Sequence, residues 1–219
     1  MIIRTTLKEQ AYVHLKEAIL NGTIKNDVMY SEQWCADLLN ISRTPVREAL
    51  LQMKNEDIIE IYSNKGVMLR PITEQEVTEI MQMRTAIEGY CCIHLVQHIH
   101  DPLARELIVN LEKIIENMSR MHDIGNYTEY IKRDLQFHTE IIEFSRSQKF
   151  MQATEKMYFR MEQFSFEVIA SRSERAIEEH TSILNAIKKG DPTEAYAACM
   201  DHLEKIRIKM LECIDQEKQ

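Results

Sequence analysis

The sequence predicts a mainly α-helical protein, with a small domain of three helices and a β-hairpin followed by a larger all-helical bundle. Three observations predict this fold class. Only five glycines and four prolines interrupt the 219 residues, which favours long helices over sheet. Apolar residues recur at helical spacing along most of the chain. Residues 58–70 hold two short apolar segments around a polar, glycine-bearing turn, as a β-hairpin does.

The first 70 residues are predicted to contain the three helices and the hairpin. The first helix covers residues 7–20 and ends at Asn21-Gly22, a usual helix ending. Ser31 can cap a second helix. We expect four of its residues to be buried: Trp34, Cys35, Leu38 and Leu39. A third helix starts near Ser42. Three helices followed by a hairpin describe a winged helix-turn-helix, whose third helix lies in the major groove of DNA.

The start of the third helix carries the most informative residues of the chain. Residues 42–50 read Ser-Arg-Thr-Pro-Val-Arg-Glu-Ala-Leu, and Pro45 suits a first helical turn, whose amides have no helical partner. Arg43, Thr44 and Arg47 therefore stand at an exposed helix start, where they can meet an anion or a base edge. Arginines of surface helices usually come late, where they complement the helix dipole. Their early place predicts a nucleic-acid contact, which the alternative of a well-capped core helix leaves unexplained.

This part of the chain resembles the DNA-binding domain of GntR-type bacterial transcription regulators. The resemblance rests on residues 42–50, with weaker support from Ser31-Glu32 and Lys65-Gly66. Many relatives have arginine where this chain has Gln33, so one phosphate or base contact is expected to be weaker or replaced. The resemblance implies that the operator is contacted by Arg43, Thr44 and Arg47, and its minor groove by Lys65 and Gly66.

Composition adds limits on where the protein works and how it meets DNA. The formal net charge is −8, yet residues 1–70 hold nine basic and nine acidic residues, so the acidic excess lies in residues 71–219. The basic footprint is therefore local, and tight DNA binding is expected to need a dimer. The five cysteines are scattered without a Cys-x-x-Cys pair, which favours reduced core thiols. No signal peptide and no apolar run of about 20 residues is evident, so we expect a cytoplasmic protein without a membrane partner.

The boundary between the domains is predicted at Pro71, giving a DNA-binding domain at residues 1–71 and a helical domain at residues 72–219. Thr73, followed three residues later by Glu76, forms a capping box that opens the second domain. Six helices are expected there, in an antiparallel bundle, over about 74–98, 101–121, 126–145, 148–170, 173–189 and 192–214.

Four residues of this bundle can converge. Asp134 and His138 are four apart, so they project from one face of the third helix of the bundle. His180 and His202 flank the turn Gly190-Asp191-Pro192, which suits an antiparallel pair of helices. At about 1.5 Å per residue, both imidazoles lie about 15–16 Å from the turn and level with each other.

Three imidazoles and a carboxylate suit a divalent metal ion, with zinc as the first choice and nickel, iron or manganese as alternatives. Four side chains complete a tetrahedral ion but leave positions vacant on an octahedral one, where a carboxylate or water can bind. Spacing alone leaves open that these are ordinary polar residues on helix surfaces.

Residues 74–214 resemble the all-helical FCD effector domain that accompanies GntR-type DNA-binding domains in the FadR subfamily. Its landmarks here are Arg84-Thr85-Ala86-Ile87-Glu88, Asp134-Leu135-Gln136-Phe137-His138, Glu179-His180 and Met200-Asp201-His202. In metal-binding members an aspartate and three histidines at these places hold the ion, and six helices suggest the VanR-like branch. The resemblance thus assigns the metal to Asp134, His138, His180 and His202.

Arg84 has two interpretations. It can pair with Glu88 four residues later, a routine contact along a helix. It can also line the pocket and bind an effector carboxylate through two N–H groups, which the resemblance favours.

The sequence therefore predicts a one-component transcription regulator, a repressor rather than an enzyme. Two copies are expected to form a homodimer on a two-fold symmetric, double-stranded operator, and a small carboxylate effector is expected to bind at the metal. Two alternatives stay open. The metal can be purely structural beside an apolar effector, or the chain can be a metal-dependent hydrolase, although no His-Glu-x-x-His signature occurs.

Overall fold

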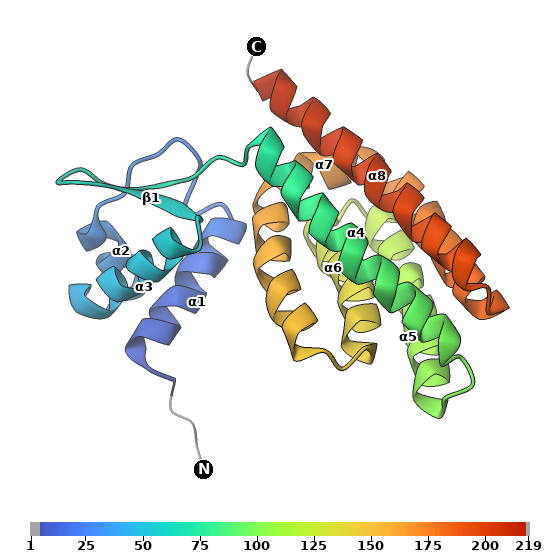
Figure 1. Ribbon diagram of the computed structural model, residues 1–219. Helices are drawn as coiled ribbons and strands as arrows, with labels where there is room; N and C mark the ends of the chain where they lie inside the picture. Colours follow the sequence, from blue (N-terminus) through green and yellow to red (C-terminus); the bar gives the residue numbers. More distant parts are fainter. Residues whose placement is uncertain (1–4, 218–219) are drawn as a thin grey trace. The chain divides into compact units, whose positions relative to one another are not determined.

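The computed structural model describes residues 5–217, and for residues 164–167, 169, 170 and 217 the backbone alone. The chain divides into two compact units, Met1–Pro71 and Ile72–Gln219. Both units are built mainly of helices, and the first also contains a two-stranded antiparallel sheet (Figure 1). The predicted fold class is confirmed. Within the described residues, no helix has a stretch long and apolar enough to cross a membrane.

The first unit contains three helices and a hairpin. They are α1 Leu7–Leu20, α2 Glu32–Leu39, α3 Arg43–Asn55, β1 Ile59–Tyr62 and β2 Gly66–Leu69. The strands pair with Ile59 opposite Leu69 and Tyr62 opposite Gly66. Helices α1 and α3 pack together over a buried face that includes Leu15 and Leu50. This arrangement is the predicted winged helix-turn-helix, with the hairpin as its wing.

Helix α2 departs in part from the predicted burial. Ser31 caps it as predicted, because its Oγ accepts a hydrogen bond from the Trp34 amide at 3.0 Å. Trp34 and Leu38, however, are 36% and 40% exposed, so the prediction that both are buried was wrong. Cys35 and Ala36 form the buried face instead. A helix of two turns covers its neighbours with one narrow face, and small side chains there let it pack closely.

The second unit contains five helices in its described residues. They are α4 Glu74–Gln97, α5 Pro102–Asp123, α6 Tyr127–Phe144, α7 Gln148–Lys189 and α8 Pro192–Glu217. Helix α4 lies along α8, α8 pairs with α7, and α5 pairs with α6, as Figure 1 shows. Their inner faces share one apolar core, so the polar residues buried within it stand out.

The helices predicted at 148–170 and 173–189 are joined in the structure as the single helix α7. No proline or glycine interrupts this stretch, so the backbone hydrogen bonds can continue through it. Figure 1 shows that the two halves of α7 nevertheless run in different directions. Ser171 Oγ donates to the Val168 carbonyl at 2.9 Å, a back-bond that commonly accompanies a bend.

The turn between α7 and α8 forms as predicted. Gly190 ends α7 with a φ of +75°, in the left-handed region that glycine favours. Asp191 Oδ1 then accepts the amides of Thr193 and Glu194 at 2.9 and 3.0 Å, and Pro192 begins α8. The turn therefore fixes the register between the two helices and with it the relative height of His180 and His202.

Candidate metal centre and DNA-contact residues

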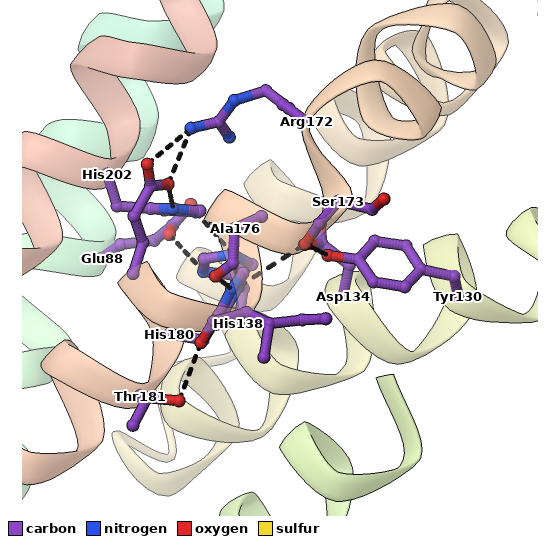
Figure 2. Close-up of polar contacts among 12 residues, drawn as sticks. Glu88, Tyr130, Asp134, His138, Arg172, Ser173, Ala176, His180, Thr181 and His202 are labelled. Atoms are coloured by element: carbon purple, nitrogen blue, oxygen red, sulfur yellow. Dashed lines mark hydrogen bonds and ion pairs between the residues drawn. The ribbon is translucent and has the colours of Figure 1, made fainter. Parts of the chain in front are cut away.

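The structure brings together the four residues assigned to a metal. Helix α6 supplies Asp134 and His138, α7 supplies His180, and α8 supplies His202 (Figure 2). All four are buried: His180 and His202 are 0% exposed, His138 2% and Asp134 7%. The core of the helical unit thus surrounds a cluster of polar side chains from three helices.

The three imidazoles meet through their Nε2 atoms. His138 Nε2 lies 3.1 Å from His180 Nε2 and 3.3 Å from His202 Nε2. One ligand nitrogen from each ring lies within 4.8 Å of the other two. Asp134 adjoins this group through Oδ1, which is 3.5 Å from His180 Nε2.

The other nitrogen of each ring, Nδ1, is bonded to a group that can only accept (Figure 2). The acceptors are Glu88 Oε2 for His138 at 2.8 Å, the Ala176 carbonyl for His180 at 2.6 Å, and Glu179 Oε2 for His202 at 2.8 Å. Because an ionised carboxylate or a carbonyl can only accept a hydrogen bond, each Nδ1 must carry the hydrogen and donate it. In a neutral ring the Nε2 atom then has a free lone pair.

Burial keeps two of these rings, His180 and His202, neutral. It lowers the pKa of His180 to about 4 and lowers the pKa of His202 well below its ordinary value, with the neighbouring histidines adding to the effect at His202. Near neutral pH the free Nε2 lone pairs of His180 and His202 therefore both face His138 Nε2 at close range. They repel unless a cation or a proton lies among them. Two nitrogens on one tetrahedral zinc stand about 3.3 Å apart, so the observed spacing fits a metal ion.

Glu88, the partner of His138, is held by Arg84. Arg84 Nε donates to Glu88 Oε1 at 2.5 Å and Nη2 to Oε2 at 3.3 Å, and both residues are 2% exposed. Tyr158 donates a further bond to Oε1 at 3.1 Å. Burial alone raises the pKa of Glu88, but the charge of Arg84 and the hydrogen bonds from His138 and Arg84 outweigh it and hold the pKa below its usual range. The structure thus contains the Arg84–Glu88 pairing, and the effector contact of Arg84 stays a prediction.

Glu179, the partner of His202, is held by Arg172. Arg172 Nη2 donates to both carboxylate oxygens at 2.7 Å, and Lys205 Nζ lies 3.6 Å from Oε1. These three residues also line an open groove of about 760 Å³ between α7 and α8. One side of the centre is therefore sealed in the core at Arg84, and the other lies next to solvent at Arg172.

The two orienting carboxylates were not predicted from the sequence. Glu88 stands four residues after Arg84, and Glu179 directly precedes His180, so both were within the segments that carry the resemblance. Each carboxylate binds a histidine of a neighbouring helix: Glu88 of α4 binds His138 of α6, and Glu179 of α7 binds His202 of α8. Such a contact depends on how the two helices pack, which sequence spacing does not give.

The predicted DNA-contact residues lie on the surface of the first unit. Thr44 and Lys65 are exposed, and the side chains of Arg43 and Arg47 are 57% and 60% exposed. Lys65 stands at the tip of the wing, next to Gly66 at the start of β2. Arg43, Thr44 and Arg47 were predicted at an exposed helix start, and all three are exposed, whereas Gly66 is half-buried.

Gly66 has a structural reason of its own. Its φ is +136°, and a Cβ atom there would lie 2.3 Å from the Tyr30 carbonyl oxygen. The same region pairs Tyr30 with Val67 through two backbone hydrogen bonds of 2.8 Å. The glycine therefore lets the wing dock on the segment that precedes α2.

Family models match most of the chain. Residues 7–69 match the model for bacterial regulatory proteins of the gntR family, and residues 79–205 match the model of the FCD domain. A solved structure from Rhodococcus sp. RHA1, titled a putative transcriptional regulator GntR, has the same fold with a TM-score of 0.80. It is 19% identical and covers 95% of this chain and 99% of its own.

Curated relatives are regulators as well. The uncharacterized HTH-type transcriptional regulator YdhC of Bacillus subtilis is 25% identical over 88% of this chain and 86% of its own length. The gluconate operon transcriptional repressor of Bacillus licheniformis is 27% identical over 81% of this chain and 74% of its own length. These proteins are transcription regulators and not enzymes, which excludes the hydrolase alternative. The chain belongs to the GntR family of DNA-binding transcription regulators, with a gntR-type domain followed by an FCD domain.

Proposed function

We propose that this regulator is a cytoplasmic repressor whose affinity for its operator is set by a small organic acid bound at a divalent-metal centre in the helical unit. One observation carries the proposal. Three buried imidazoles direct their Nε2 atoms at one another, with His138 Nε2 at 3.1 and 3.3 Å from the other two, while every Nδ1 is used elsewhere. A protein core keeps such an arrangement when a cation or a shared proton lies among the nitrogens, and three imidazoles beside a carboxylate favour the cation.

The ion would be held by Asp134, His138, His180 and His202, with zinc first and nickel, iron or manganese as the other candidates. When bound, the ion would supply a positive charge. An ion that takes more than four ligands would also leave coordination positions open for an effector carboxylate. Glu88 and Glu179 orient two of the imidazoles and raise their basicity toward the ion. The apolar core around them excludes water, which strengthens each of these interactions.

The groove beside Arg172 is the route by which we propose that the acid reaches the centre. Four basic residues of its lining can attract a carboxylate, and four acidic ones oppose it: Arg172, Arg175, Lys205 and Lys209 against Glu178, Glu179, Asp201 and Glu212. The predicted contact between Arg84 and an effector carboxylate has fewer donors available, because Arg84 Nε and Nη2 already donate to Glu88. A carboxylate therefore meets Arg84 through Nη1, which lies 3.5 Å from Met161 Sδ, unless Glu88 moves.

On the DNA side, two copies form a homodimer that presents two α3 helices to a two-fold operator. Arg43, Thr44 and Arg47 contact it in the major groove, and Lys65 and Gly66 reach the minor groove. Membership of the family and the exposure of the arginines support this assignment.

Melting temperatures with a panel of small carboxylic acids, measured with and without a chelator, test the effector proposal. We expect an acid of the panel to raise the melting temperature of the metal-loaded protein and to lose this effect in chelator. A purely structural metal is the second candidate, and the near-complete burial of its ligands favours it. In that case chelator lowers the melting temperature, and the acids have no effect on either form, which contradicts the effector proposal.

Arg47→Ala tests the DNA assignment. The variant is expected to weaken operator binding by about tenfold or more, because a bidentate base contact contributes about 1–3 kcal/mol. Lys54→Ala is the matched control, since it removes one positive charge from the exposed far end of the same helix. Equal affinities of the two variants for the operator would contradict the assignment.

A further inference from the structure

The two arginines assigned to the operator share one carboxylate in the first unit. Arg47 Nε lies 3.1 Å from both oxygens of Glu32, and Arg47 Nη2 lies 2.8 Å from Oε2. Arg43 Nη2 lies 3.4 Å from the same Oε2. The Glu32 side chain is 23% exposed, against 57% and 60% for Arg43 and Arg47. One acidic residue of α2 thus faces both arginines of α3.

Glu32 is held firmly in this position. It is the first residue of α2, directly after the cap Ser31, where a negative charge complements the helix dipole. Tyr30, just before the cap, is bonded to Val67 of the wing. The hydrogen bond from Arg47, more than burial, sets the pKa of Glu32 and lowers it, so the residue is ionised near neutral pH.

Glu32 does not block the end of the Arg47 guanidinium that can contact a base. A guanidinium has five N–H groups in a planar fork. Glu32 binds the side edge, formed by Nε and Nη2, whereas a guanine is read end-on through Nη1 and Nη2. Arg47 can therefore keep its contact with Glu32 while it contacts a base. The carboxylate fixes the direction of the fork and cancels part of the positive charge that draws arginine to phosphates.

We propose that Glu32 is a specificity-determining residue, which aims Arg47 at a base edge and weakens the attraction of Arg43 and Arg47 for DNA of any other sequence. The proposal rests on the DNA contacts assigned above to these arginines. Nonspecific binding depends on phosphate neutralisation, so a carboxylate beside the arginines opposes it directly. Operator binding depends on direction as well, which the same carboxylate supplies.

The test compares Glu32→Gln with Glu48→Gln in the full-length protein. Glu48 is exposed on α3, so its variant removes the same charge from the helix that carries both arginines, without touching the shared ion pair. Selection from random double-stranded DNA first defines the operator. Fluorescence anisotropy then gives the affinity of each variant for this operator and for a scrambled duplex of equal composition, at several salt concentrations.

We expect Glu32→Gln to lower the ratio of operator to scrambled affinity by about fivefold or more relative to Glu48→Gln, mainly by tighter binding of the scrambled duplex. Equal ratios for the two variants, with Arg47→Ala still weakened on the operator, would overturn this inference and leave the DNA assignment standing. Unchanged operator binding by Arg47→Ala would overturn both.

Discussion

Each histidine of the centre uses its two ring nitrogens for different purposes. Nδ1 donates to a fixed acceptor, which sets the tautomer and the direction of the ring, and Nε2 is left for a ligand. The acceptors come from three sources: a carboxylate sealed in the core, a carboxylate beside the groove, and a backbone carbonyl of the same helix. The centre is thus prepared for a cation by residues that would not touch it.

Removal of one imidazole tests whether the cluster holds the metal. His202→Ala is expected to reduce bound divalent metal from near one per chain to below about a tenth, because the variant loses a fully buried ligand of the proposed centre. Metal analysis of purified protein measures this. His98→Ala, which changes the C-cap residue of α4 outside the cluster, serves as the control, and equal metal content in both variants would contradict the assignment.

The carboxylates behind the histidines are expected to matter almost as much. Glu179→Gln should weaken metal binding by about 10- to 100-fold, because a neutral amide no longer raises the basicity of His202. A competition titration against a chromogenic chelator gives the affinity. Glu178→Gln changes the exposed neighbour of Glu179 and should leave the affinity unchanged. The interpretation fails if the two variants bind metal alike.

Burial of neutral histidines also predicts the pH dependence of stability. His180 has a pKa of about 4 when folded and 6.5 when unfolded, so the unfolded chain binds more protons between these values. The free energy of unfolding of metal-free protein should therefore fall as the pH drops from 6.5 to 4, by roughly 3 kcal/mol from this residue. Urea denaturation in chelator measures the slope. His180→Gln should flatten it, and an unchanged slope would contradict a buried neutral imidazole.

At the residue scale the sequence predicted which candidate ligands lie together, but not the carboxylates that bind their Nδ1 atoms. Asp134 and His138 share a helix face by spacing, and a turn with Gly190 and Pro192 places His180 level with His202. Glu88 could not be linked to His138 in this way, because the contact depends on how α4 lies against α6. Long-range packing of this kind has no local sequence period to reveal it.

Among the elements, the wing shows how a backbone requirement can coincide with a functional residue. Gly66 was assigned to the minor groove by resemblance, and the structure gives it a close approach to the Tyr30 carbonyl. The segment from Tyr30 to Glu32 thereby connects the wing with the arginines of α3. Element boundaries in this unit were predictable because caps and turns are local signals, whereas the exposure of Trp34 was not, because it depends on which face of α2 its neighbours cover.

Gly66→Ala should destabilise the first unit. A Cβ at this position meets backbone at 2.3 Å and requires a φ that alanine rarely adopts, so we expect a loss of about 2–3 kcal/mol. Gly22→Ala is the matched control. Its φ is +75° with nothing within 4 Å of the added atom, and its expected loss is about 1 kcal/mol. Chemical denaturation compares them, and equal losses would show that the wing does not need this approach.

In helix α7, by contrast, local signals did not predict the element boundaries. Its 42 residues contain no proline or glycine, and the serines near residue 171 are weak signals that fit an end as well as a bend. The structure resolves this as one helix that changes direction, with Tyr130 donating to the Ser173 carbonyl at 3.0 Å beside the bend. His180 lies at the same distance before Gly190 in the predicted pair of helices and in the observed bent helix. The wrong helix count therefore did not affect the predicted position of His180.

For the molecule as a whole, control of DNA binding requires that the effector bind two states of the protein with different affinity. The proposed metal centre belongs to one unit and the proposed recognition helix to the other. If the acid binds more tightly to the state that binds DNA weakly, it lowers operator affinity, and by linkage operator DNA lowers the affinity for the acid. A repressor that is released by its effector needs this sign.

Operator affinity under combined control of metal and acid tests this account most directly. Fluorescence anisotropy with the selected operator would compare metal-loaded protein, chelator-stripped protein and His202→Ala, each with and without the acid that stabilises the loaded form. The account predicts that the acid weakens operator binding by about tenfold in the loaded protein and has no effect in the other two. The same weakening in stripped protein and in His202→Ala would contradict it.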